Sequence, residues 1–114
     1  MSGNAPEIAL PQLPHARVAI ISSSWHVDIC NDLIAGAQRA LKAASISDVE
    51  VIYVPGSFEI PLAAQLAFEK GFSAVVAVGL VLEGQTPHFD YICQGVTQGV
   101  MDVSLKFSAP IGFG

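Results

Sequence analysis

The stretch "SAVVAVGLVL", residues 73–82, decides the fold class of this chain. It reads as a strand that is apolar throughout. Such a strand is expected in a parallel sheet whose two faces are both covered by helices. The run is also far too short to span a bilayer. The segments on either side of it therefore have to supply further strands and the covering helices.

Three further segments read as strands, because each is a short apolar or β-branched run next to turn residues. They are "RVAIIS" (17–22), "VEVIYV" (49–54) and the start of "APIGFG" (109–114).

The segments between these strands carry helix signals. Serines before the first helix are suited to cap it, Pro61 fits the first turn of the second, and a glycine ends the second. The predicted helices begin near Trp25 or His26, near Ser57 and at Pro87, and they end near Ser45, at Gly71 and near Phe107.

Strand and helix alternate three times, which predicts one α/β domain over residues 1–114 with right-handed crossovers. The expected architecture has three layers, α/β/α, with a flavodoxin-like, parallel four-stranded sheet and helices on both faces. Residues 1–16 contain Pro6, Pro11 and Pro14, so we expect an extended arm there.

Composition narrows the possible partners. Hydrophobic residues make up 52% of the chain and charged residues 13%, which is apolar for a monomer, so other subunits are expected to cover part of the surface. A net charge of −5 with five Lys plus Arg argues against nucleic acid. The N-terminus lacks a secretory pattern, and a soluble, cytoplasmic protein without membrane contact is expected. Cys30 and Cys93 show no metal-finger or redox spacing and are read as reduced, packed thiols.

Ligands of such sheets collect at the carboxyl ends of the strands. Three polar stretches should therefore meet on one rim, and this convergence predicts a site. They are "SSSWH" (22–26), "PGSFE" (55–59) and "EGQTPH" (83–88).

The stretch "EGQTPHFDY" (83–91) has two readings. Gly84 permits close backbone approach, and amides around Gln85 and Thr86 at a helix start would suit a phosphate. An ordinary helix cap explains the same residues. Neither a Walker lysine nor a GxGxxG pattern is present, which disfavours a nucleotide. His88 could accept and return protons in a reaction, or it could be a packed residue.

Other residues on the rim also leave alternatives open. The indole of Trp25 could stack on a heterocycle or staple the helix start. Glu59 could complement a helix dipole or hold the amide donors of a ring. His26 and Cys30 have a spacing that permits metal binding, but no further ligands are evident, so no metal is expected. Gly95 and Gly99 allow a close helix contact, which could lie between subunits.

Together, "SSWH", "VPGSFEIP" and "GLVLEGQTPHFDY" resemble the lumazine synthase family, from about Arg17 to Gly114. The resemblance implies condensation of 5-amino-6-(D-ribitylamino)uracil with 3,4-dihydroxy-2-butanone 4-phosphate to 6,7-dimethyl-8-ribityllumazine, with release of phosphate and water. No metal or organic cofactor takes part in the reaction of that family. Its members form pentamers, some of which assemble into 60-subunit shells.

The resemblance also implies a role for each matching residue. His88 would be the acid–base residue, and Trp25 would stack on the pyrimidine. Phe113 would be contributed by an adjacent subunit. Ser57, Phe58, Glu59, Leu80, Val81 and Leu82 would contact the pyrimidine and the ribityl chain, and Gly84, Gln85 and Thr86 would bind phosphate.

Two departures from the family pattern stand out. Glu83 occupies a position where many members have arginine, so a negative charge flanks the proposed phosphate turn. The chain also stops at Gly114, whereas the family continues with two more helices and an arginine of the phosphate site. We therefore expect a truncated chain that is unstable, weakly active or inactive by itself.

Two other functions fit parts of the pattern. One is a non-catalytic flavin- or lumazine-binding or shell-forming protein that keeps the fold and the pocket. The other is a generic flavodoxin-like signalling domain, which is disfavoured because no acidic cluster follows the strand at 17–22.

Overall fold

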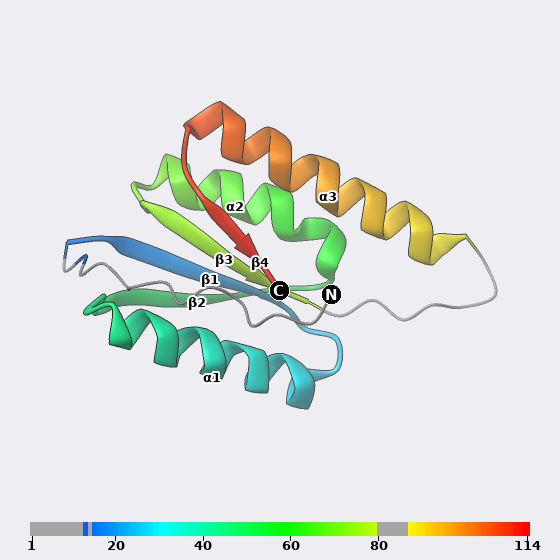
Figure 1. Cartoon of the computed structure of the whole chain (residues 1–114). Coiled ribbons are helices and arrows are strands. Elements are labelled where there is room, and N and C mark those ends of the chain that lie inside the picture. Colours follow the sequence, from blue (N-terminus) through cyan, green and yellow to red (C-terminus); the bar gives the residue numbers. More distant parts are fainter. Residues whose placement is uncertain (1–12, 14, 80–86) are drawn as a thin grey trace, which may run out of the picture.

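The structure is a computed structural model that describes residues 13, 15–79 and 87–114 (Figure 1). These residues form a parallel sheet with the strand order β2-β1-β3-β4. Helix α1 covers one face of the sheet, and α2 and α3 lie side by side on the other (Figure 1). The predicted three-layer, flavodoxin-like architecture is confirmed.

The elements follow the predicted order. Strand β3 begins at Ala74 and ends at Val78, which is shorter than the predicted strand 73–82. Residues 80–82 lie outside the described part of the chain. The bounds are β1 Arg17–Ser23, α1 Val27–Ala43, β2 Asp48–Val54, the 3₁₀ helix η1 Ser57–Glu59, α2 Ile60–Glu69, β3 Ala74–Val78, α3 His88–Phe107 and β4 Ile111–Phe113.

Strand β1 is one of the two inner strands of the described sheet, and its side chains contribute to the core on both faces. It pairs with β2 on one side and with β3 on the other, and every residue after Arg17 is buried. Successive side chains of a strand point to opposite faces. Ile21 accordingly packs in the cluster under α2 and α3, whereas Ile20 packs against Ile34 of α1. Both faces of the sheet are therefore covered, as the apolar stretch predicted.

The predicted serine cap of α1 is wrong. The helix begins at Val27, and the residue before it, His26, has a left-handed backbone (φ 52°) and no capping side chain. The hydroxyl of Ser24 instead donates to the carbonyl of Val54 at 2.8 Å. Because β1 and β2 end side by side, the end of β2 offers the serine an acceptor outside its own helix.

The second helix is predicted to begin near Ser57, but Ser57 opens the short helix η1 and α2 begins at Ile60. The amide of Gly56 donates to the carboxylate of Glu59 (N to Oε2, 3.0 Å). Pro61 lies in the first turn of α2, as predicted. The start of η1 is therefore closed by a carboxylate three residues after the glycine.

The predicted stop of α2 at Gly71 is confirmed. Gly71 has a left-handed backbone (φ 96°), which a glycine adopts without steric cost. Its amide donates to the carbonyl of Phe68 (3.0 Å), and the amide of Phe72 donates to that of Ala67 (3.1 Å). These two bonds form a Schellman motif.

Arg17 joins several segments at the amino-terminal edge of the sheet. Its guanidinium pairs with Asp48 (Nε to Oδ2, 3.1 Å) and lies 4.2 Å above the ring centre of Phe72. It also donates to the carbonyl of Lys70 (3.3 Å), and its amide donates to the hydroxyl of Ser73 (3.1 Å). The start of β1 is thus tied to the start of β2 and to the turn after α2.

The close contact predicted for Gly95 and Gly99 lies within the chain, so its suggested place between subunits is wrong. A Cβ on Gly99 would lie 2.7 Å from Cγ of Pro61, and a Cβ on Gly95 would lie 2.6 Å from Cε1 of Phe58. The reason is that α3 packs beside α2 and η1 on the same face of the sheet.

We expect Gly99→Ala to destabilise the fold. The new methyl group would overlap the ring of Pro61, which cannot rotate away, and overpacking of this kind costs about 1–3 kcal/mol. Gly36→Ala in α1 is the matched control, because the nearest side-chain atom would be 3.6 Å from its Cβ. The control should gain up to about 1 kcal/mol from helix propensity. Urea unfolding measures both variants, and a Gly99→Ala chain as stable as the control would contradict the packing described here.

Candidate active site

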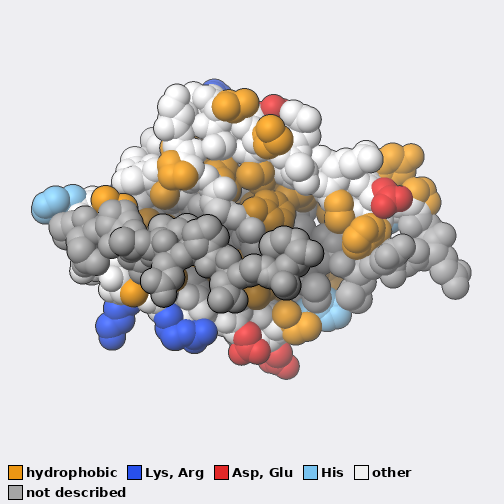
Figure 2. Space-filling model, in the orientation of Figure 1, with side chains coloured by type: hydrophobic (Ala, Val, Ile, Leu, Met, Phe, Trp, Pro, Cys, Tyr) orange, Lys and Arg blue, Asp and Glu red, His pale blue; other side chains and the backbone are white. Residues whose placement is uncertain are grey.

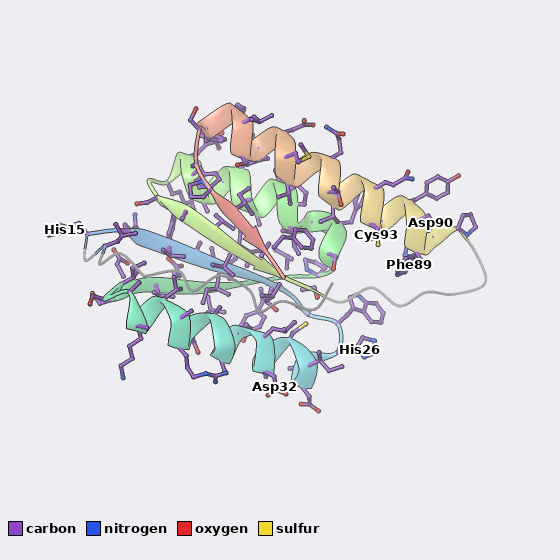
Figure 3. All side chains as sticks on the ribbon, viewed as in Figure 1. His15, His26, Asp32, Phe89, Asp90 and Cys93 are labelled. Carbon is purple, nitrogen blue, oxygen red and sulfur yellow. The ribbon has the colours of Figure 1, made fainter. Side chains whose placement is uncertain are left out.

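The site lies where the strands end. All strands of the described sheet are parallel, so their carboxyl ends share one rim, and α1 and α3 begin there. Figure 3 shows His26 at the start of α1 and Phe89 and Asp90 at the start of α3 on this side of the molecule, with His15 at the opposite end. The predicted convergence of the segments after β1 and β2 with the start of α3 is therefore present.

Trp25 and Glu59 flank the same glycine on this rim. A Cβ on Gly56 would lie 3.7 Å from two atoms of the indole and 3.2 Å from Oε2 of Glu59. The side chain of Trp25 is 66% exposed, whereas a hydrophobic staple would be packed. Of the two readings of Trp25, this exposure favours an aromatic surface that is open to a ligand.

Cys30 supports the backbone beneath that indole. Its thiol is buried and donates to the carbonyl of Trp25 at 3.2 Å, and Oγ of Ser23 lies 3.6 Å from the sulfur. In the described part of the chain, no group of three or more His, Cys, Asp or Glu residues could hold a metal ion.

A cavity of about 270 Å³ lies between the start of α3 and the ends of β3 and β4. The hydroxyl oxygen of Ser57 is buried and has no hydrogen-bond partner among the described residues. It lies against Gly79, where a Cβ would come within 2.6 Å of it. Because buried polar groups are normally paired, this hydroxyl makes the cavity a candidate ligand site. The lining residues are Ser57, Gly79, Phe89, Cys93, Val96, Thr97, Phe113 and Gly114.

A wider, more open groove of about 840 Å³ runs along α3. Phe58 and Tyr91 line it, and both rings are more than half exposed. Figure 2 shows hydrophobic side chains across the middle of the face in view, whereas most charged side chains in that view lie along the lower edge, over α1.

The predicted site residues divide into two sets. His88 is the first residue of α3, and Trp25, Phe58 and Glu59 lie in the segments that follow β1 and β2. Phe113 ends β4 and lines the same cavity as Ser57. The remaining predictions, Leu80, Val81, Leu82, Gly84, Gln85 and Thr86, lie outside the described residues, as does Glu83.

Sequence reasoning missed the residues that complete the cavity. Phe89 and Cys93 are four positions apart on α3, which places them on the same side of that helix (Figure 3). That spacing was a usable signal. The role of Gly79, by contrast, depends on the position of Ser57 more than twenty residues away.

The fold is that of an α/β protein with a flavodoxin-like sheet, and a candidate ligand site lies on the carboxyl rim of that sheet. Residues 15–114 match the sequence profile of the family described as 6,7-dimethyl-8-ribityllumazine synthase. The chain therefore belongs to this family, and the predicted family is confirmed.

Curated proteins agree with this result. The chain is 47% identical to 6,7-dimethyl-8-ribityllumazine synthase of Streptomyces coelicolor over 115 residues, which cover all of the chain and 71% of that relative. It is 49% identical to the enzyme of the same name from Arthrobacter sp. strain FB24, with 74% of that relative covered. In the described residues, no helix is long and apolar enough to cross a membrane.

We expect Ser57→Ala to leave the stability of the ligand-free protein unchanged or to raise it. The substitution removes a buried hydroxyl that has no partner among the described residues, and an unpaired buried group costs about 1–3 kcal/mol. Ser22→Ala is the control, because the buried hydroxyl of Ser22 donates to the carbonyl of Ser23 at 2.9 Å. The control should lose about 1 kcal/mol. If thermal unfolding shows equal losses for both, Ser57 has a partner within the protein.

Proposed function

We propose that this chain condenses 5-amino-6-(D-ribitylamino)uracil with 3,4-dihydroxy-2-butanone 4-phosphate to form 6,7-dimethyl-8-ribityllumazine. Family membership supports this reaction. The observation that carries it is the meeting of Trp25, the segment Ser57–Glu59 and the start of α3 on one rim. The experiments below test this assignment residue by residue.

Trp25 and Glu59 form the proposed end of the site for the pyrimidine. The exposed indole offers a flat surface on which a heterocycle can stack. One oxygen of Glu59 accepts the amide of Gly56, which fixes the carboxylate beside the indole. The second oxygen could then accept an N–H of the ring. Stacking and hydrogen bonding would thus orient the pyrimidine together.

Ser57 and its cavity form the proposed continuation of the site. The buried hydroxyl can donate to and accept from a polyol, which fits the ribityl chain. Phe58, Leu80, Val81 and Leu82 are proposed to complete this part of the site. The turn at Gly84, Gln85 and Thr86 is proposed to bind the phosphate of the second substrate, just before α3 begins.

His88 is the proposed acid–base residue. The condensation forms a Schiff base, loses phosphate and closes a ring, and each of these steps moves protons. An imidazole at the first position of α3 directly follows the segment proposed to hold the phosphate. Most of the remaining rate gain would come from positioning two substrates next to each other.

We also propose that the protein works as a homo-oligomer, a pentamer or a 60-subunit shell. Large apolar side chains are exposed on α2 and α3, among them Leu62, Leu66, Met101 and Leu105. Phe113 is exposed as well, so it is accessible to a neighbouring subunit. A single domain and a cytoplasmic location stay predictions.

His88→Ala should lower kcat by about 10²- to 10⁴-fold, the range for loss of an acid–base group. Affinity for the ribitylaminopyrimidine should change little. His15→Ala is the control, since His15 lies at the opposite end of the molecule (Figure 3). Lumazine absorbance gives the rate, and calorimetry gives the affinity. Pyrimidine binding without turnover in the unaltered chain would instead favour a non-catalytic binding protein.

Mixing two inactive variants tests the role of Phe113. If the site takes His88 from one subunit and Phe113 from its neighbour, reassembled oligomers of His88→Ala and Phe113→Ala chains should regain activity. Random mixing at equal amounts restores both residues in about a quarter of the sites. A mixture that stays at the level of the separate variants would show that Phe113 serves its own chain, as the cavity shared with Ser57 also allows.

A further inference from the structure

We propose that Gly95 is a positioning residue for the site, because the lack of a side chain there sets where the ring of Phe58 lies. The inference rests on the proposed function, in which Phe58 belongs to the segment that binds the ribitylaminopyrimidine. Gly95 itself would touch no substrate. It would act only through the aromatic ring beside it.

The ring of Phe58 lies directly against the backbone of α3 at this position. A Cβ built on Gly95 would lie 2.6 Å from Cε1, 3.3 Å from Cδ1 and 3.6 Å from Cζ of that ring. Separations below 3 Å between such carbons are a steric overlap, since the optimal distance is about 3.5–4.0 Å. Any residue larger than glycine would therefore push the ring away from the helix.

The ring is able to move if it is pushed. The side chain of Phe58 is 57% exposed and lines the open groove along α3 together with Gly95 and Tyr91. Displacement into the groove meets little packing, so the helix would stay in place and the ring would shift. We therefore expect a methyl group at position 95 to change the geometry of the site and to leave the stability of the fold nearly unchanged.

The other helix glycines behave differently. At Gly99 the overlapping atoms belong to the fixed ring of Pro61, so the backbone itself must give way. At Gly36 the nearest atom would be the end of Arg39, 3.6 Å away, so a methyl group fits. Among these three positions, Gly95 is the one where a methyl group would move an exposed aromatic side chain.

Phe58 lies between two residues that are proposed to hold the ribitylaminopyrimidine. Phe58 is flanked in η1 by Ser57, whose hydroxyl lines the cavity, and by Glu59, whose carboxylate lies beside Trp25. His88 is seven residues before Gly95, and the helix that carries it would not move. Gly95→Ala should thus weaken pyrimidine binding while leaving the proton-transfer step nearly intact.

The first experiment compares Gly95→Ala with Gly36→Ala in the full chain. We expect the KM for the ribitylaminopyrimidine to rise about three- to tenfold in Gly95→Ala, the range for a misplaced aromatic contact. The KM for the butanone phosphate and kcat should each change less than twofold. The thermal midpoint should change by a few degrees at most. Gly36→Ala should leave both KM values unchanged. A Gly95→Ala chain with unaltered pyrimidine KM overturns the inference.

A double variant separates positioning from general disturbance of the helix. Phe58→Ala removes the ring, so adding Gly95→Ala to it should produce no further rise in pyrimidine KM. If Gly95→Ala still raises KM in the Phe58→Ala background, the effect does not pass through the ring, and the inference fails.

The same series keeps the inference apart from the proposed function. If Phe58→Ala raises the pyrimidine KM and Gly95→Ala does not, the proposed function stands and the inference falls. If Phe58→Ala leaves that KM unchanged, the assignment of Phe58 to the pyrimidine site fails, and the inference fails with it.

Discussion

The rest of the structure depends on the burial of β1 on both of its faces. Ile20 and Ile21 are neighbours in sequence, yet they pack into separate clusters on opposite sides of the sheet. A strand that is apolar on both sides gains free energy only if helices cover both faces, and parallel neighbours with helical crossovers supply that cover. Because all strands then run in one direction, their carboxyl ends share one rim. The site is therefore a geometric result of how the core is buried.

The candidate site also depends on the close packing of α3 against the start of α2. Glycines at positions 95 and 99 let the backbone of α3 lie against Phe58 and Pro61. The helix that begins with His88 is thereby aligned with the segment that carries Ser57 and Glu59. A proposed proton-transfer group and a proposed binding segment that lie far apart in the sequence therefore belong to elements that pack against each other.

Sequence patterns predicted those features that depend on neighbouring residues. A strand within the apolar stretch 73–82, Pro61 in a first helical turn and Gly71 at a helix end each depend on local sequence, and each is present. The predicted serine cap of α1 is absent, and the hydroxyl of Ser24 donates instead to the carbonyl of Val54, thirty residues away in the sequence. The unpaired hydroxyl of Ser57 and its contact with Gly79 likewise depend on strand order, which no local pattern specifies. Residues 80–86 lie outside the described structure, so their predicted roles stay predictions.

Arg17 and its partners stabilise the end of the sheet where the strands begin, opposite the rim where they end. The guanidinium of Arg17 contacts Asp48, the ring of Phe72 and the turn after α2 there. This end of the sheet lies about the length of a strand away from Trp25 and Ser57. Residues that stabilise the fold and residues proposed to bind substrate thus lie at opposite ends of the sheet. Mutations at the rim can therefore alter ligand contacts without weakening the contacts of Arg17, because the effects of distant mutations on the free energy of unfolding are nearly additive.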